Sequence, residues 1–112
     1  MVFVKINDVQ YPAVVNGNMR DTHWDDRQSK SITLTMDYQT ASDLFVDGLE
    51  WSIIMVQQEE VNGEVVDVVE EFRNDDYNIA GDITDHRDGT ITAKMGCLTA
   101  LEEAYEMLLG GI

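Results

Sequence analysis

The chain has 112 residues, 44% of them hydrophobic, which is enough for one folded domain with its own core and excludes disorder throughout. Its 22 acidic and seven basic residues give a formal net charge of −15. Such a charge repels nucleic acid and anionic membranes and attracts basic proteins. No apolar run approaches the roughly 20 residues of a membrane helix. We therefore expect one domain, residues 1–112, that binds neither nucleic acid directly nor a membrane.

The start of the chain and its single cysteine indicate the compartment. MVFVKINDVQ lacks the charged, apolar and small-residue regions of a signal peptide, so we expect no export by that route. Cys97 excludes an internal disulfide and suits a reducing environment. A small buried residue ahead of the last helix is its commoner role, and a reactive thiol is the alternative that the sequence leaves open.

The first expected elements are two strands. Residues 2–6 are expected to alternate between two faces, with Val2, Val4 and Ile6 on one and Phe3 and Lys5 on the other. Asn7-Asp8 suits a tight turn, and residues 9–15 form the second strand. Pro12 has no backbone N–H, so this strand is expected at a sheet edge or with a bulge at that position.

Residues 16–30 are rich in turn formers and show no periodicity, which predicts a long loop. The one large apolar residue in it, Trp24, either folds back to cap the core or serves as an exposed contact anchor. Residues 31–37 alternate strictly and predict a strand. The side chains expected on its inner face are Ile32, Leu34 and Met36.

A short helix is expected next. Thr40 and Asp43 approximate a capping box at its start, and Gly48 suits the left-handed residue after its end. The predicted helix has about two turns and buries Leu44 and Phe45.

Residues 51–72 hold the clearest local signal in the sequence. Two β-rich runs flank Asn62-Gly63, and a type I′ turn requires the positive φ angles that Asn and Gly tolerate best. We therefore expect a hairpin whose apolar base is buried and whose tip stands in water. The turn sets the cross-strand pairs Ile53–Phe72, Val56–Val69 and Gln58–Asp67. The tip residues are Glu59, Glu60, Asn62, Gly63 and Glu64.

A second long hairpin is expected from residues 77–84 and 90–95, closed by residues 85–89. Gly81 in its first strand indicates a bulge or a close approach of another group to the backbone. The side chains expected on the inner face of the return strand are Ile91, Ala93 and Met95.

The last expected element is a helix. Thr99 and Glu102 form a capping box, and the helix ends near Gly110. Its apolar stripe needs cover, so we expect it to pack on the sheet. The stripe consists of Leu101, Ala104, Tyr105 and Leu108. Together the elements predict an α+β fold: a mainly antiparallel sheet of six or seven strands built from hairpins, one short helix, and a C-terminal amphipathic helix packed on one face.

No arrangement of residues indicates catalysis. The sequence lacks a GxSxG motif, a glycine-rich phosphate loop, a CxxC pair and an HExxH motif. The loop with Asp85, His86 and Asp88 does not fit an EF-hand. When Gly89 is aligned with the invariant glycine of an EF-hand loop, the first and last ligand positions fall on Thr84 and Met95, which do not supply carboxylates. An irregular metal site in that loop, or one of His23 with Asp21 and Asp25, stays open. We expect no enzyme and no cofactor.

Two stretches, FVKINDVQYPAVV and SITLTMDYQTASDLFVDGLEWSI, together resemble small uncharacterised proteins of bacteriophages and prophages that are encoded in or beside tail modules. The likeness covers the first half of the chain and some of the second hairpin. It rests on a short hydrophobic-Lys-Ile-Asn hairpin and a Thr-rich strand. The resemblance implies a virion or prophage-accessory protein, in the cytoplasm of the bacterial host or in the virion, and it transfers no catalytic residue.

Two functions are carried forward as hypotheses. The first is a structural or assembly protein of a phage particle that docks through strand edges and the acidic hairpin on a protein partner, either a second copy of the chain or another virion protein. Its expected contact residues are Trp24, Glu59, Glu60, Asn62, Gly63 and Glu64. The alternative is an acidic decoy in which residues 31–72, with ten acids and neither Lys nor Arg, imitate DNA phosphates and occupy a basic nucleic-acid-binding protein of the host. The decoy requires those acids to be arrayed on one face.

Overall fold

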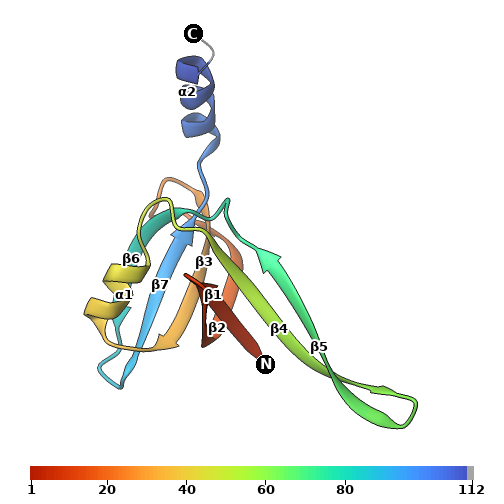
Figure 1. Cartoon of the computed structure of the whole chain (residues 1–112). Coiled ribbons are helices and arrows are strands. Elements are labelled where there is room, and N and C mark those ends of the chain that lie inside the picture. The colour runs from red at the N-terminus through yellow and green to blue at the C-terminus, as the bar shows by residue number, and fades with distance from the viewer. Residues whose placement is uncertain (111–112) are drawn as a thin grey trace.

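Figure 1 shows a computed structural model of the chain, which describes residues 1–110 except the side chains at positions 18, 19 and 110. The strands are β1 (Val2–Ile6), β2 (Val9–Asp21), β3 (Arg27–Thr35), β4 (Trp51–Val61), β5 (Glu64–Arg73), β6 (Ile79–Asp85) and β7 (Thr90–Gly96). The helices are α1 (Tyr38–Leu44) and α2 (Ala100–Gly110). Within the described range the strands form a seven-stranded sheet in the order β5-β4-β1-β2-β3-β7-β6, with antiparallel neighbours throughout. The expected α+β class with a sheet of six or seven strands is confirmed.

β2 joins the two halves of the sheet. Up to Pro12 it pairs with β1, and from Ala13 to Asp21 it pairs with β3. Pro12 therefore lies in an interior strand, so the expected edge position is wrong, and the register shift that does occur lies between Asn16 and Met19. Proline is tolerated at position 12 because the ladder to β3 begins only at the next residue.

The long loop expected over residues 16–30 is wrong. β2 continues to Asp21 and β3 begins at Arg27, so a short turn of residues 22–26 connects two long strands. Polar residues pair across the ladder, as Arg20 does with Gln28. Pairing with a neighbouring strand overrides the low strand propensity of this stretch, which is why composition alone misplaced it.

The hairpin of β4 and β5 follows the expectation closely. Asn62 and Gly63 have φ angles of 53° and 81°, the signs that a type I′ turn needs. The ladder runs without a register shift. The expected pairs all form: Ile53–Phe72, Val56–Val69 and Gln58–Asp67. One expectation is wrong: the base is buried on β4 but exposed on β5, because β5 is the outermost strand and no element within residues 1–110 covers it.

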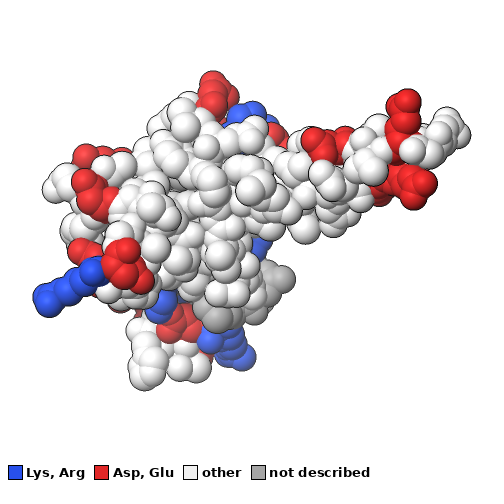
Figure 2. Space-filling model, turned by 90° about the horizontal axis from the view of Figure 1, so that it is seen from below, with Lys and Arg blue, Asp and Glu red and all other residues white. Residues whose placement is uncertain are grey.

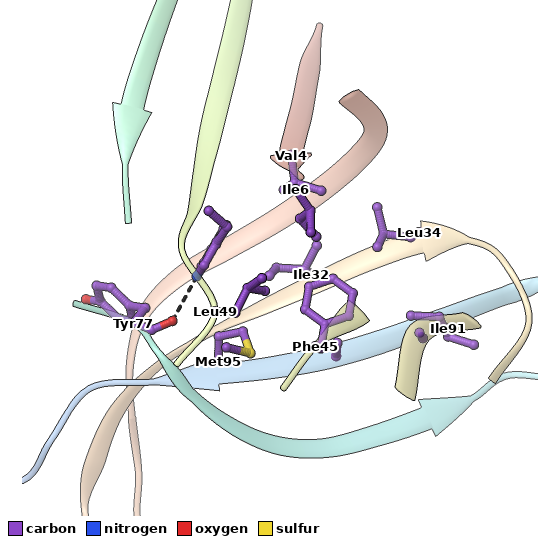
Figure 3. Packing of buried hydrophobic residues seen from close by; sticks show 12 residues of the cluster. Val4, Ile6, Ile32, Leu34, Phe45, Leu49, Tyr77, Ile91 and Met95 are labelled. Carbon is purple, nitrogen blue, oxygen red and sulfur yellow. Dashed lines mark hydrogen bonds between the residues drawn. The ribbon is translucent and has the colours of Figure 1, made fainter. Parts of the chain in front are cut away.

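The core lies between the sheet and α1, which packs against β6 and β7 (Figure 1). Trp51 is 2% exposed, and its Nε1 donates a hydrogen bond of 2.8 Å to the carbonyl oxygen of Tyr77 (Figure 3). The inner faces expected for β3 and β7 are confirmed, with Met36 partly buried at their margin. The buried cluster contains Val4, Ile6, Ile32, Leu34, Ala41, Phe45, Leu49, Trp51, Tyr77, Ile91, Ala93 and Met95.

α1 begins earlier than expected. Asp37 is its N-cap, and the carboxylate accepts a hydrogen bond of 2.7 Å from the backbone N–H of Thr40. Thr40 therefore lies inside the first turn, and the expected capping box of Thr40 and Asp43 is wrong, because Asp is a better N-cap than Thr. Phe45 is buried as expected and Leu44 is partly buried against the core.

α2 forms where it was expected but does not pack as expected. Its capping box is present: the N–H of Glu102 donates to Oγ1 of Thr99 at 3.2 Å, and the N–H of Thr99 donates to Oε1 of Glu102 at 2.9 Å. The helix projects from the sheet (Figure 1), and Leu101 is 81% exposed. The expected packing on one face is therefore wrong. α1 already covers the inner face, and Arg27 of β3 holds Glu102 in the first turn of α2 so that the helix points outward.

Candidate interaction surface

The outer part of the β4–β5 hairpin leaves the body of the molecule as a two-stranded finger. β1 supports β4 as far as Val2, which pairs with Met55. The backbones of Met1 and Val56 then exchange two hydrogen bonds, of 2.8 and 2.9 Å. Beyond that point β4 pairs with β5 alone. We call residues 57–68 the finger, and Figures 1 and 2 show it standing clear of the rest of the molecule.

The hairpin carries negative charge on both faces. Successive residues of a strand point to opposite faces and cross-strand partners share a face, so the register sorts the acids of β4 and β5. One face carries Glu60, Asp67 and Glu71. The other face carries Glu59, Glu64 and Glu70.

The expected tip residues are brought together at the end of the finger. Figure 2 shows acidic side chains gathered there, on the part of the molecule farthest from the body. The tip residues are all exposed: Glu59, Glu60, Asn62, Gly63 and Glu64. The tip is therefore free to contact another molecule from either face.

The free edge of β5 carries exposed apolar side chains among its acids, a feature that the sequence analysis missed. Val65 is 68% exposed, Val69 is 60% exposed, and Phe72 is exposed near the base. Proteins usually protect a long edge strand with charged side chains, Pro or a bulge. β5 has neither Pro nor a register shift, and its protection consists of charged side chains, mainly the acids Glu64, Asp67, Glu70 and Glu71. Apolar residues on both faces of β5 suggested burial at the base. Their exposure follows from the position of β5 at the edge, which the sequence does not give.

Trp24 packs on the sheet and does not join the tip. A methyl group at Gly81 would lie 2.7 Å from Cη2 of Trp24, and one at Gly96 would lie 2.9 Å from Cζ3. The guanidinium of Arg27 lies 4.8 Å from the ring centre. The β6–β7 register shifts around Gly81, as expected. The half-buried Trp24 thus caps the sheet, and its turn between β2 and β3 lies at the end of the sheet away from the finger (Figure 1).

Arg27, which is buried, ties α2 to the sheet. Its Nη1 donates to the carbonyl oxygen of Cys97 at 2.7 Å and to Oε1 of Glu102 at 2.6 Å, while Nη2 donates to Oε2 of Glu102 at 3.1 Å. The hydrogen bonds from Arg27 and from the capping box lower the pKa of Glu102 to about 2. Burial raises the pKa of the half-buried Cys97 thiol, which favours a packing role over a reactive one.

Replacing Glu102 with glutamine is expected to lower stability at neutral pH and to have little effect near pH 2. The pKa of this carboxyl falls from 4.5 to about 2 on folding, so its contribution is fully present above about pH 4.5 and is lost as the pH falls toward 2. Urea unfolding of the wild type and Glu102→Gln across this range measures the difference. A difference that stays constant down to pH 2 would contradict a stabilising Arg27–Glu102 pair.

α2 is a second exposed apolar element. Its acids Glu102, Glu103 and Glu106 occupy one side of the helix, and apolar residues fill the remaining arc. An isolated helix of eleven residues is marginal in water, so its apolar arc needs cover to be stable. The large exposed side chains are Leu101, Tyr105, Met107, Leu108 and Leu109, each between 58% and 81% exposed.

The turn between β6 and β7 uses its polar side chains internally. Oδ1 of Asp85 accepts a backbone N–H two residues along the chain at 2.9 Å, and Oδ1 of Asp88 accepts the N–H of Thr90 at 3.0 Å. Nε2 of His86 lies 2.7 Å from Oγ1 of Thr92. Within residues 1–110, no group of three or more His, Cys, Asp or Glu residues is placed to hold a metal ion.

A hollow of about 500 Å³ at the base of the hairpin is lined by paired charges. Nζ of Lys5 lies 3.4 Å from Oε1 of Glu71, and Nη2 of Arg73 lies 2.6 Å from Oδ2 of Asp75. Asp8 and Glu50 also line the hollow, and both are exposed to solvent. Neither described helix is long and apolar enough to cross a membrane.

Comparison of the chain with protein-family models, with curated proteins and with solved structures finds no match. The features of the chain that bear on its function are therefore the finger, the free edge of β5 and the exposed face of α2.

Proposed function

We propose that the chain is a non-enzymatic structural or assembly protein that docks on other proteins through the finger and the free edge of β5. The finger carries this proposal. Twelve residues, 57–68, stand out from the body as two strands with exposed valines and carboxylates. A two-stranded hairpin alone is at best marginally stable in water. Such a hairpin gains stability when another strand or surface covers it.

The resemblance of the first half of the chain to phage tail-module proteins supports a phage or prophage particle as the setting. A protein of this kind works in the cytoplasm of the bacterial host during assembly or within the virion. Its partners are then copies of itself or other proteins of the particle. Exposed strand edges and protruding hairpins are common means of joining subunits, since backbone hydrogen bonds supply affinity without a preformed pocket.

The acids of the finger favour contact with basic proteins. Acidic groups lie on both faces, and neither Lys nor Arg occurs between residues 31 and 72. A partner with a basic rim around an apolar strip complements the finger, because the carboxylates flank the exposed valines. The attraction between exposed charges weakens as salt shortens the Debye length, from about 10 Å at 0.1 M to about 3 Å at 1 M.

The arrangement of acids does not favour the DNA-mimic alternative. A mimic of duplex phosphates needs its carboxylates on one face, whereas the register of β4 and β5 divides theirs between two faces. Asp37 caps α1, and Asp47 accepts the N–H of Ala80 at 2.8 Å, so these acids serve the fold. The assembly function is therefore the one that we propose.

Replacing the tip acids is expected to reduce docking by about tenfold or more, because three favourable charge contacts are lost. The immobilised wild type is used to capture structural proteins of the particle from phage-producing cells, at low and at high salt. The test variant is Glu59→Gln with Glu60→Gln and Glu64→Gln. The matched control changes the same charge on exposed residues elsewhere: Asp43→Asn, Glu50→Gln and Asp82→Asn.

The control variant should capture particle proteins as the wild type does, and capture should fall as salt rises. Equal losses in the test and control variants would show that net charge alone matters, which would contradict docking through the tip. Wild-type protein that captures no particle protein at any salt concentration would contradict the proposed function itself.

A further inference from the structure

The two-residue turn fixes which backbone groups of β5 are free. In a hairpin closed by Asn62-Gly63 the flanking pair Val61–Glu64 is hydrogen-bonded, and pairs alternate from there along the ladder. Val56 agrees with this alternation, since its backbone N–H and C=O bond Met1 on the opposite side from β5. The residues that direct their N–H and C=O to the free edge are therefore Val65, Asp67, Val69 and Glu71.

We propose that β5 pairs with β5 of a second copy of this chain, antiparallel, about a two-fold axis at Val68. The two fingers then form one four-stranded sheet in the order β4-β5-β5-β4. This inference rests on the free edge used in the proposed function and names the molecule that covers it. A four-stranded sheet pairs the free edge of β5 and gives the finger the number of strands that stable sheets need.

The alternation restricts the register of such a dimer. Residues that direct their N–H and C=O to the free edge must face residues of the second copy that do the same. These residues all have odd numbers, so the numbers of two facing residues add to an even number. The two-fold axis therefore passes through a residue and not between two residues. An axis at Asp67 would place its carboxylate against the second copy's Asp67 and Glu64 against Glu70. An axis at Val69 would place Asp67 against the second copy's Glu71.

Of the axes at Asp67, Val68 and Val69, only the axis at Val68 places no acid directly opposite another acid. Like charges directly opposite each other destabilise a sheet, so this register is preferred. In this register four pairs of edge-directed residues face each other across the two copies. Each such pair forms two backbone hydrogen bonds, which gives about eight new bonds. The facing residues are Glu64 with Phe72, Val65 with Glu71, Val66 with Glu70, Asp67 with Val69, and Val68 with Val68.

Salt distinguishes this dimer from docking on a basic partner. Each copy has a formal net charge of −15, and acids on neighbouring positions of the two fingers lie diagonally across the new interface. Screening therefore strengthens self-association and weakens docking on a basic surface. A failure of the dimer and a failure of the proposed function thus have different signatures.

Sedimentation velocity of the full chain at low and high salt tests the dimer. The wild type should form dimers with an association constant that rises at least severalfold with salt. Val69→Pro removes one N–H directed to the free edge and leaves the bonds to β4 intact, so it should be monomeric. Val69→Ala keeps that N–H and should still dimerise. A monomeric wild type at all salt concentrations, or dimers of Val69→Pro as tight as those of the wild type, would overturn the proposal.

Disulfide trapping tests the register. In a Cys97→Ser background, Val68→Cys places two thiols opposite each other in a non-hydrogen-bonded pair, with Cα atoms about 4.5 Å apart. Val66→Cys is the matched control on the same face of β5, and its two copies would lie four residues apart, about 13 Å along the strand. Val68→Cys should give a covalent dimer and Val66→Cys should not. Equal cross-linking of both variants, or of neither, would overturn the register.

Discussion

Replacing Trp51 with alanine is expected to lower the free energy of unfolding by about 3–5 kcal/mol, the range for large aromatic residues in a core. Trp51 starts β4 at the point where the hairpin meets the body, and it is 2% exposed. The substitution leaves a cavity among the residues drawn in Figure 3 and removes the hydrogen bond from Nε1 to the carbonyl oxygen of Tyr77. Urea unfolding followed by circular dichroism measures the loss.

Trp51→Phe is the control for cavity formation. Phenylalanine retains most of the apolar volume and loses the indole N–H, so its cost should be about 1–2 kcal/mol, within the range for a lost hydrogen bond and a small change in packing. A loss below about 1 kcal/mol for Trp51→Ala would show that the base of the hairpin is not part of the cooperative core. The position of β4 in the sheet would then need another explanation.

The register of the β4–β5 hairpin could be predicted because it depends on local geometry alone. Asn62 and Gly63 adopt the positive φ angles that these two residue types tolerate best, and reflection about the turn gives every pair along the ladder. Gly81 is a similar case, since a strand glycine signals a bulge or a close contact, and both are present there. Local chemistry was sufficient in these places.

The parts that could not be predicted depend on which elements become neighbours. Residues 16–30 have the composition of a loop, yet long-range pairing of β2 with β3 makes most of them strand. The apolar stripe of α2 predicted burial on the sheet, but the salt bridge between Arg27 and Glu102, 75 residues apart in the chain, directs the helix outward. A hydrophobic pattern shows that a surface needs cover and does not show which molecule covers it.

The candidate site also has parts that could be predicted from the sequence and parts that could not. The exposed acidic tip with Asn62 and Gly63 could be predicted from the turn and the charges that flank it. The free edge of β5 could not, because strand order is a property of the whole sheet. Trp24 was assigned two possible roles from its isolation among polar residues, and its contacts with Gly81 and Gly96 come from strands far away in the sequence. Those contacts give Trp24 its capping role.

Placing alanine at Gly81 is expected to cost about 1–3 kcal/mol, the usual range for overpacking. The added methyl group would lie 2.7 Å from Cη2 and 2.9 Å from Cζ3 of Trp24, and 3.1 Å from Cβ of Lys94. Either the indole ring leaves its place over the sheet or β6 moves away from β7. Gly17→Ala is the matched control, since its methyl group would meet only the Lys30 side chain at 3.5 Å or more, and it should change stability by less than about 0.5 kcal/mol.

A double-mutant cycle identifies the cause of the cost. If the clash with Trp24 dominates, Gly81→Ala should be nearly neutral in a Trp24→Ala background, with a coupling energy of about 1 kcal/mol or more. Chemical unfolding of the four proteins gives this energy. Additive effects of the two substitutions would mean that Trp24 does not pack on Gly81, and the tryptophan would then be free to act as a contact anchor. A large coupling instead ties Trp24 to the stability of the sheet and leaves the finger, the β5 edge and α2 as the surfaces available to partners.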